Sequence, residues 1–284
     1  MILVFGKSGQ VATELAQFAD VTCLGRDDCD LEIPEKCCAA ILRSKPSAVI
    51  NAAAYTAVDL AETEVEKAKR LNTDAPTEMA KCCAALDIPF VHISTDYVFD
   101  GSGDRPWRET DATAPLGVYG RTKRDGEIAV MAANPAAVIL RTSWVFSQHR
   151  ANFVKTMLRL GATRDTLSIV ADQVGDPTPA RAIAQACHHI ATHADASKTG
   201  IYHFAGVPQT TWADFARTIF DDAQMQVSVT DITTADYPTA AQRPLNSRLD
   251  CSRIFADFRI KKTRMAACLN AGVGRLKQGI GRRE

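Results

Sequence analysis

Residues 1–12, MILVFGKSGQVA, carry the pattern from which the fold class follows. Residues 2–5 are apolar and suit a buried strand, and a helix-period pattern of apolar side chains runs through residues 11–18. Gly6 and Gly9 lie between the two, in the spacing G-x-x-G-x-x-A that is related to the dinucleotide-binding turn. The chain therefore begins with a predicted strand, a glycine turn and a helix.

The same turn predicts a phosphate site. Its small residues let the chain turn tightly and let backbone approach a pyrophosphate, while the helix start offers free N–H groups. We assign the cofactor turn to Gly6, Gly9, Gln10 and Val11. A strand-to-helix turn without any ligand is the alternative.

Strand and helix patterns then alternate along the first half of the chain. Further short apolar runs predict strands at 21–24, 48–53, 89–95 and 138–141. Helical patterns fall between them. One starts near Pro34 and ends before Pro46, and two helical segments follow from about 58 to 86. This alternation predicts an α/β protein with a Rossmann-type, doubly wound parallel sheet and helices on both faces.

The second half is less regular and predicts a smaller C-terminal substrate-binding lobe. Turn-rich stretches occur at 172–179 and 236–244. We expect residues 1–145 with about 178–206 to form the NAD(P)-binding Rossmann domain. Residues of about 146–177 with 207–284 are expected to form the lobe.

Composition limits the classes of protein. The 284 residues include 33 basic and 33 acidic side chains, so a net charge of zero favours neither nucleic acid nor a membrane surface. No apolar run reaches the ~18 residues that span a bilayer, and the N-terminus does not resemble a signal peptide. Nine cysteines, an odd number with two adjacent pairs, indicate free thiols in a reducing cytoplasm rather than disulfides.

The end of the second predicted strand bears on the choice of nucleotide. Gly25 and Arg26 stand where an acidic residue would hold the ribose hydroxyls of NAD. We therefore expect NADPH, with Arg26 at its phosphate, although Asp27 or Asp28 could bind the ribose instead. The cofactor site is also expected to include Asp30 and Leu31.

Tyr119 and Lys123 form a Y-x-x-x-K pattern on a predicted helix. Positions four apart share a helix face, so an ammonium could lower the pKa of the phenol and make it a general acid for a carbonyl oxygen. Such a pair also occurs by chance on exposed helices. Two predicted strands end in segments that could join this pair, Ser94-Thr95-Asp96 and Asn51 to Thr56. Ligands of open α/β sheets bind outside the carboxyl ends of the parallel strands, so these segments and the Tyr/Lys helix are expected at one edge of the sheet.

Longer stretches resemble the extended short-chain dehydrogenase/reductase family. They are GKSGQV (6–11), NAAAYTAVDLAE (51–62), STDYVFDGSGDRPWRETDATAPLGVYGRTK (94–123), RTSWVF (141–146), NFVKTMLRL (152–160) and ADYPTAAQRPLNSRLD (235–250). The glycine turn is common to many families, whereas the long middle block and RPLNSRLD are typical of one subgroup. The last thirty residues match poorly.

The resemblance implies a role for individual residues. Thr95, Tyr119 and Lys123 match the catalytic hydroxyl, tyrosine and lysine. The segment along the cofactor is matched by Ala54, Tyr55 and Thr56, where the family often has histidine in place of Tyr55. The sugar contacts are matched by Thr95, Asp96 and Trp144.

Three of these assignments keep an open alternative. Trp144 could be a core side chain that follows a strand. Arg243 and Asn246 are assigned to the substrate, with the guanidinium on its phosphates, or else belong to a solvated loop. His92 inside the fourth strand is expected to be a hydrogen-bonded core histidine, and no metal site is expected at the histidines of 188–193.

The activity implied is NAD(P)H-dependent reduction of the keto group of a dTDP-linked 4-keto-6-deoxy sugar. Family members use NADPH or NADH, and some are homodimers with an interfacial magnesium ion, so both features stay open for this chain. Two other functions remain: an NADP-binding regulatory subunit like that of methionine adenosyltransferase, and a nucleotide-sugar epimerase or dehydratase. Dehydratases of this type tend to carry Asp-Glu where this chain has Asp96-Tyr97.

Overall fold

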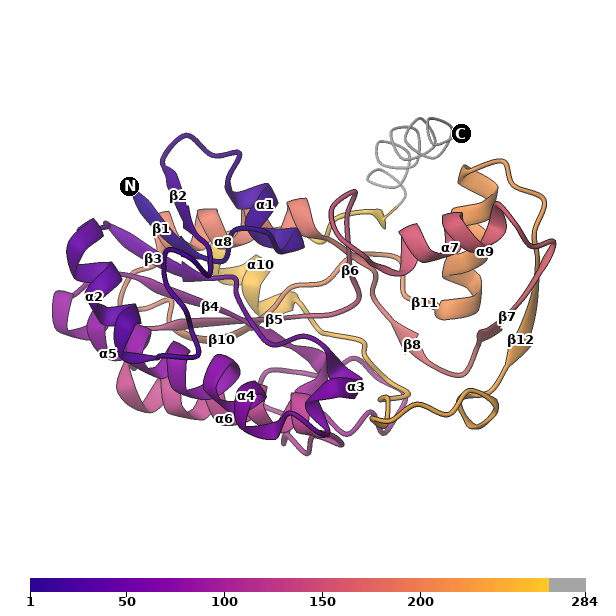
Figure 1. Cartoon of the computed structure of the whole chain (residues 1–284), viewed down its shortest axis with the longest axis horizontal. Coiled ribbons are helices and arrows are strands. Elements are labelled where there is room, and N and C mark those ends of the chain that lie inside the picture. The colour runs from indigo at the N-terminus through magenta and orange to yellow at the C-terminus, as the bar shows by residue number, and fades with distance from the viewer. Residues whose placement is uncertain (266–284) are drawn as a thin grey trace.

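A computed structural model describes residues 1–265 of the chain. It contains a parallel sheet of six strands in the order β10-β5-β4-β3-β1-β2 (Figure 1). These strands are β1 (Ile2–Phe5), β2 (Val21–Leu24), β3 (Ala48–Asn51), β4 (Phe90–Thr95), β5 (Val138–Thr142) and β10 (Gly200–His203). The doubly wound fold class expected from the sequence is confirmed.

Alternate side chains of each strand enter different cores, because successive residues of a strand point to opposite faces. Ile2 and Val4 of β1 pack on the face covered by α1 (Gln10–Leu15), α8 (Ala180–His193) and α10 (Ser252–Phe258). Leu3 and Phe5 pack on the other face, covered by α2 (Glu35–Ser44), α5 (Ala75–Leu86) and α6 (Val118–Ala133). Apolar residues on both sides explain why the strands read as continuous apolar runs.

Short helical segments connect the sheet to α5 and α6. They are α3 (Val58–Ala61), α4 (Val65–Lys69), the π-helical turn η1 (Arg70–Asp74) and the 3₁₀ turn η2 (Asp96–Val98). Strand β3 ends at Asn51, two residues before the predicted end. The Asn51 side chain accepts a hydrogen bond from the backbone N–H of Ala53 at 3.1 Å, which turns the chain out of the sheet.

A second, smaller lobe has its own core. Helices α7 (Phe153–Gly161) and α9 (Trp212–Asp222) pack together beside a parallel pair, β7 (Thr166–Val170) and β12 (Ser228–Ile232). The remaining small elements are β6 (Val145–Phe146), β9 (Thr178–Pro179), β8 (Val174–Gly175), β11 (Thr210–Thr211) and the 3₁₀ turn η3 (Thr234–Asp236). β6 pairs with β9, and β8 pairs with β11.

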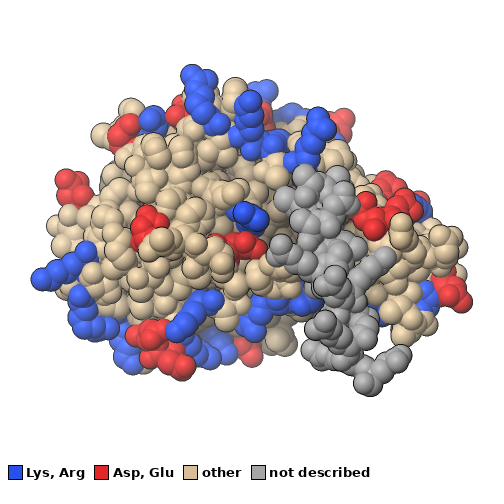
Figure 2. Space-filling view, turned by 90° about the horizontal axis from the view of Figure 1, so that it is seen from above, with Lys and Arg blue, Asp and Glu red and all other residues tan. Residues whose placement is uncertain are grey.

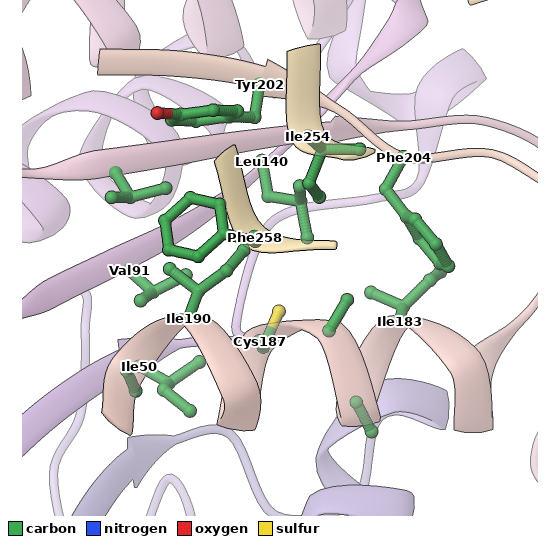
Figure 3. Close-up of a cluster of buried hydrophobic side chains, with 14 of the residues drawn as sticks. Ile50, Val91, Leu140, Ile183, Cys187, Ile190, Tyr202, Phe204, Ile254 and Phe258 are labelled. Atoms are coloured by element: carbon green, nitrogen blue, oxygen red, sulfur yellow. The ribbon is translucent and has the colours of Figure 1, made fainter. Parts of the chain in front are cut away.

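The chain returns from the lobe to the sheet before residue 265. Leu249, Ile254 and Phe258 are buried in the same core as Tyr202 of β10, and the close-up in Figure 3 shows Phe258 and Ile254 among side chains of the sheet and α8. The predicted division placed all of 207–284 in the lobe. Within that range, the seven residues of α10 pack on the sheet, and so short a helix gives no sequence signal for the partner that it covers.

Three further observations bear on the expectations from composition. The eight described cysteines are free, as predicted, and Cys268 lies outside the described residues. Among residues 1–265 no helix is long and apolar enough to cross a membrane. On the face seen in Figure 2, basic and acidic side chains are interspersed.

Candidate active site

A cavity of about 760 Å³ lies at the carboxyl ends of the strands. It adjoins β1 and β3, between which the strand order reverses, and this is the position where open α/β sheets bind ligands. Most of the predicted site residues line it. They are Gly6, Gly9, Gln10, Val11, Arg26, Asp30, Leu31, Ala54, Thr56, Thr95, Asp96, Tyr119, Lys123 and Trp144.

The glycine turn leaves room for a ligand. Gly6 has φ of +117°, a conformation that side chains disfavour, and a Cβ there would lie 3.2 Å from the backbone of Ala52. A Cβ on Gly9 would meet nothing within 4 Å, so this backbone faces open space. The volume also suits a cofactor-sized ligand. The turn therefore fits a dinucleotide on observations independent of its motif.

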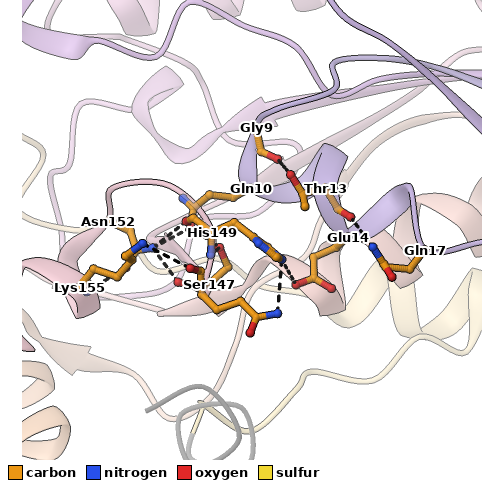
Figure 4. A network of polar contacts seen from close by, with 10 residues as sticks. Gly9, Gln10, Thr13, Glu14, Gln17, Ser147, His149, Asn152 and Lys155 are labelled. Carbon is orange, nitrogen blue, oxygen red and sulfur yellow. Dashed lines mark hydrogen bonds and ion pairs between the residues drawn. The ribbon is translucent and has the colours of Figure 1, made fainter. Parts of the chain in front are cut away.

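Gln10 has a structural role that its motif does not reveal. Its side chain donates to the carbonyl of Val145 at 3.3 Å and accepts from Ser147 at 2.7 Å and Asn152 at 3.0 Å. Figure 4 shows Gln10, Ser147 and Asn152 gathered between α1 and the start of α7. The side chain thus ties the phosphate turn to residues 145–152.

The end of β2 carries cations that are paired with acids. Arg26 is exposed and contacts Asp30 and Glu32, and Lys7 lies 3.5 Å from Asp28. Asp28 also accepts from the backbone N–H of Gly25 at 2.8 Å. Lys67, which sequence reasoning missed, lines the cavity beside the same Glu32. A phosphate at this end would find three cations, Lys7, Arg26 and Lys67, within the cavity wall.

Tyr55 does not line the cavity, unlike its predicted neighbours Ala54 and Thr56. Its hydroxyl donates to Glu64 at 2.9 Å, and its backbone N–H donates to Asn72 at 2.8 Å. A carboxylate nine residues away thus holds the phenol toward α4, outside the cavity lining, and the cofactor contact expected of Tyr55 stays a prediction.

Tyr119, Lys123 and Thr95 meet in the cavity wall, as the helix spacing predicts. Desolvation raises the pKa of Tyr119 to about 12; a hydrogen bond with Thr95 lowers it, and the charge of Asp96 raises it. The pKa is therefore raised overall and not lowered as was predicted. Desolvation exceeds the other effects, and the phenol keeps its proton at neutral pH, which is the form that a general acid needs.

Lys123 is nearly inaccessible to solvent, with 1% of its surface exposed. Its Nζ donates to the carbonyl of Ile93 at 2.6 Å and lies 3.3 Å from Nε2 of His92. Burial lowers the pKa of Lys123 to about 8, while the charge of Glu127 raises it. Lys123 can therefore change charge within the physiological range.

Asp96 and Trp144 give the cavity a polar and an aromatic wall. Asp96 is 2% exposed, its Oδ2 has no hydrogen-bond partner, and burial raises its pKa to about 7. Trp144, with φ of +47°, stacks on Trp212 at 3.5 Å between ring centroids. Gly175 lies against the indole, where a Cβ would come within van der Waals radii of the ring. Trp144 thus lines the cavity and also packs against the core of the smaller lobe.

Arg243 and Asn246 do not line the cavity. Arg243 donates to Asp59 at 2.6 Å, which joins the loop after η3 to α3. Asn246 donates to the carbonyls of Ser102 and Arg105 and holds the loop before α6. In the structure these two side chains fasten loops together, and the substrate contacts expected of them stay predictions.

Sequence reasoning also missed several contributors to the site. Ser143, Arg150 and Lys7 line the cavity. Lys7 and Ser143 stand within stretches that carry the family resemblance, but no role was assigned to them, and Arg150 lies in none of these stretches. His92 is buried and hydrogen-bonded as expected, but its contact with Lys123 was not foreseen. Within residues 1–265 no group of three or more His, Cys, Asp or Glu side chains could hold a metal ion.

Comparisons with known proteins agree with this geometry. The family described as "RmlD substrate binding domain" matches residues 1–277. A dTDP-4-dehydrorhamnose reductase of Sinorhizobium fredii is 43% identical over 272 residues, covering 92% of each chain. One of Salmonella typhimurium is 41% identical over 273 residues, covering 90% of this chain and 91% of the relative.

Solved structures give the same result. A dTDP-4-dehydrorhamnose reductase of Clostridium acetobutylicum is 33% identical, has a TM-score of 0.91, and covers 97% of this chain and 99% of its own. One of Bacillus anthracis, in complex with NADP, is 29% identical with a TM-score of 0.88, covering 98% of each chain. Since the family match extends over residues 1–277, the chain belongs to the RmlD substrate binding domain family.

Proposed function

We propose that the protein reduces dTDP-4-dehydro-6-deoxy-L-mannose to dTDP-L-rhamnose with NADPH or NADH. The observation that carries this proposal is that Tyr119, Lys123 and Thr95 line one cavity together with the phosphate turn. The curated relatives named above are reductases of this kind, and they match more than nine-tenths of their own length.

A nicotinamide cofactor bound along the turn would supply the hydride. Tyr119 holds a proton at neutral pH and donates it to the oxygen of the 4-keto group. The hydroxyl of Thr95 orients the same oxygen and hydrogen-bonds the phenol. Lys123 in its charged form stabilises the phenolate that remains. Asp96 and Trp144 are positioned to hold the sugar, through an unpartnered carboxyl oxygen and an indole face.

NADPH is the proposed preference between the two nucleotides. Lys7, Arg26 and Lys67 line the cavity, and a 2′-phosphate would take the place of carboxylates as their partner. The NADP complex of the Bacillus anthracis relative supports this choice. Because Asp30 and Glu32 compete for Arg26, we propose a modest preference and retained activity with NADH. The described residues offer no cluster for magnesium, and no step is assigned to it.

The test supplies enzymatically generated 4-keto sugar nucleotide and follows the oxidation of NADPH and NADH by absorbance. Tyr119→Phe should lose about 10²- to 10⁴-fold in kcat while it still binds NADPH. Tyr237→Phe, at an exposed position of the loop after η3, is the matched control and should keep full turnover. Full turnover in Tyr119→Phe would refute the role given to Tyr119. Silence of folded wild-type protein with both nucleotides would refute the proposed substrate.

The predicted homodimer and the cytoplasmic location belong to the same proposal. Eight free cysteines suit a compartment in which thiols stay reduced. Light scattering of the purified protein, with and without NADPH, would give the oligomeric state directly.

A further inference from the structure

Lys123 has a neighbour that the proposed reaction does not use. His92 lies on β4 with none of its surface exposed, and its Nε2 is 3.3 Å from Nζ of Lys123. Its other ring nitrogen, Nδ1, lies 3.1 Å from Nδ2 of Asn51 at the end of β3. The three side chains form one line across two strands and α6.

The orientation of the Asn51 amide is fixed by the backbone. Its Oδ1 accepts from the N–H of Ala53 at 3.1 Å, so the oxygen is committed to that donor. With the amide turned over, two donors would face each other at the same distance. The Asn51 NH₂ group therefore points at His92.

The tautomer of His92 follows from this orientation. An NH₂ group can only donate, so Nδ1 must be the acceptor, and the neutral ring then carries its proton on Nε2. Burial and the charge of Lys123 both lower the pKa of His92, which keeps the ring neutral. The Nε2–H bond is therefore directed at Nζ of Lys123.

An ammonium group cannot accept that hydrogen bond, whereas a neutral amine can. We propose that His92, held by Asn51 as the Nε2–H tautomer, is a positioning residue that favours the neutral amine of Lys123 over its ammonium form. Nζ then accepts from His92 and donates to the carbonyl of Ile93. The tautomer stands on geometry alone, and its consequence for turnover rests on the proposed function.

Other charged groups near α6 do not account for this effect. Glu127, one turn further along α6, favours the ammonium form of Lys123. The charge of Glu127 is itself paired with Arg141 of β5, whose Nη2 lies 2.6 Å from Oε2 of Glu127. Acidic groups on neighbouring elements are engaged elsewhere or lie beside Tyr119. They are Asp74 of η1 with Lys69, Glu78 of α5 with Lys81, Asp59 of α3 with Arg243, Glu64 before α4 with Tyr55, and Asp96 of η2.

The first experiment reads the tautomer without any assay of activity. Two-bond ¹H–¹⁵N correlation spectra of ¹⁵N-histidine-labelled protein distinguish Nε2–H from Nδ1–H rings, and the signal missing in His92→Gln identifies His92. We expect a neutral Nε2–H ring at pH 7. An Nδ1–H or doubly protonated ring in folded wild-type protein would overturn the proposal, whatever the protein reduces.

The second experiment exchanges donor and acceptor in the hydrogen bonds from Asn51 to His92 and from His92 to Lys123. Asn51→Asp keeps an acceptor for Ala53 and offers a second one to Nδ1–H, so that Nε2 becomes an acceptor for the Lys123 ammonium. In wild type, kcat/KM for NADPH should fall about tenfold from pH 7 to pH 9 as Lys123, with a pKa of about 8, loses its charge. In Asn51→Asp we expect a fall of about twofold or less over this range.

Two variants separate this effect from a general disturbance. Asn134→Asp places the same charge at another buried asparagine whose Oδ1 accepts from the N–H two residues on, and it lies roughly 16 Å along α6 from Lys123. It should keep the wild-type pH profile. His92→Gln can accept from Asn51 and still direct an N–H at Nζ, so it should keep the profile as well. An unchanged profile in Asn51→Asp, or the same shift in Asn134→Asp, would count against the proposal.

Discussion

The buried carboxyl group of Asp96, which lines the site, lowers the stability of the folded chain when it is charged. Burial raises its pKa to about 7, so the carboxylate is disfavoured in the folded chain relative to the unfolded chain, where its pKa is near 3.8. The folded protein binds this proton more tightly. Stability is therefore undiminished below pH 4 and declines as the pH rises through the interval from about 4 to 7.

Asp96→Asn should consequently stabilise the protein while it impairs substrate binding. Above pH 7 the gain is on the order of 4 kcal/mol in the free energy of unfolding, and it should shrink toward zero near pH 4. Urea unfolding at pH 4.5, 6 and 8 measures this. A variant that is less stable than wild type at pH 8, or equally shifted at all three values, would contradict the raised pKa.

Single residues also show which parts of the site could be predicted from the sequence and which could not. Tyr119, Lys123 and Thr95 were found because their spacing on one helix and their place at a strand end are local properties. The side chains of Gln10 and Tyr55 could not be placed, because partners outside their own motifs decide where they point. Gln10 turns to Asn152 across 142 residues, and Tyr55 turns to Glu64.

Helix α6 is fastened to the sheet by a buried ion pair. Glu127 accepts from Arg141 of β5 at 2.9 and 2.6 Å and from the hydroxyl of Ser94 of β4 at 2.5 Å. Both charged side chains are about 97% or more buried. Removal of one partner leaves an uncompensated charge in the interior, which is far more costly than loss of the pair itself.

We therefore expect Arg141→Met to lower the free energy of unfolding by about 3–5 kcal/mol, and Arg141→Met/Glu127→Leu to recover part of that loss. Arg105→Met is the matched control: it breaks a two-pronged contact with Asp111 at the surface and should cost at most ~1 kcal/mol. Urea denaturation measures all three. A double variant that is less stable than Arg141→Met alone would refute the buried-charge explanation.

Helices α2 and α5 approach each other through two thiols. Sγ of Cys38 lies 2.7 Å from Sγ of Cys82, and the half-buried Cys38 is the one that solvent reaches. Burial raises the pKa of Cys82 to about 12, so its thiolate is scarce and closure should be slow at neutral pH. Glutathione disulfide should first react with Cys38, and Cys82 should then displace glutathione to complete the bond.

Under that oxidant we expect a single Cys38–Cys82 bond across 44 residues, detected in peptides by mass spectrometry. The chain-entropy model gives a stabilisation of about 4 kcal/mol, provided that the bond closes without strain. Cys38→Ser should abolish the bond, while Cys23→Ser, a half-buried thiol on β2, should leave it intact. Mixed disulfides that do not resolve, or a bond between other cysteines, would contradict the pairing.

At the scale of elements, the sequence predicted what depends on local pattern. The first five strands of the sheet were located because each contains a short run of mainly apolar or β-branched residues. Four of them are buried, whereas the edge strand β2 is only partly buried. Strand β10 was only included within a broad range. It begins at Gly200 with φ of +95° and contains His203, and only its place beside β5 makes such a segment a strand.

The whole molecule has a large hydrophobic core on both faces of the sheet and a smaller, separate core in the lobe. Both faces of the six-stranded sheet are covered by helices, whereas the lobe is built from α7, α9 and a pair of short strands. A two-stranded sheet is only marginally stable by itself, so the lobe depends on its packing against α9 and on the connections that include β6 and β9. The site needs both the sheet and the lobe, because Trp144 lines the cavity and stacks on Trp212 of α9.

This organisation predicts that the lobe opens at a lower free energy than the sheet. In hydrogen exchange followed by mass spectrometry, amides of β7, β12, α7 and α9 should exchange through partial opening, before those of β3, β4 and β5. NADPH alone should protect the ends of β1 to β4 that line the cavity, and added dTDP should extend protection to 143–161 and to α9. Equal exchange of sheet and lobe amides at every denaturant concentration would show instead that the two cores unfold as one unit.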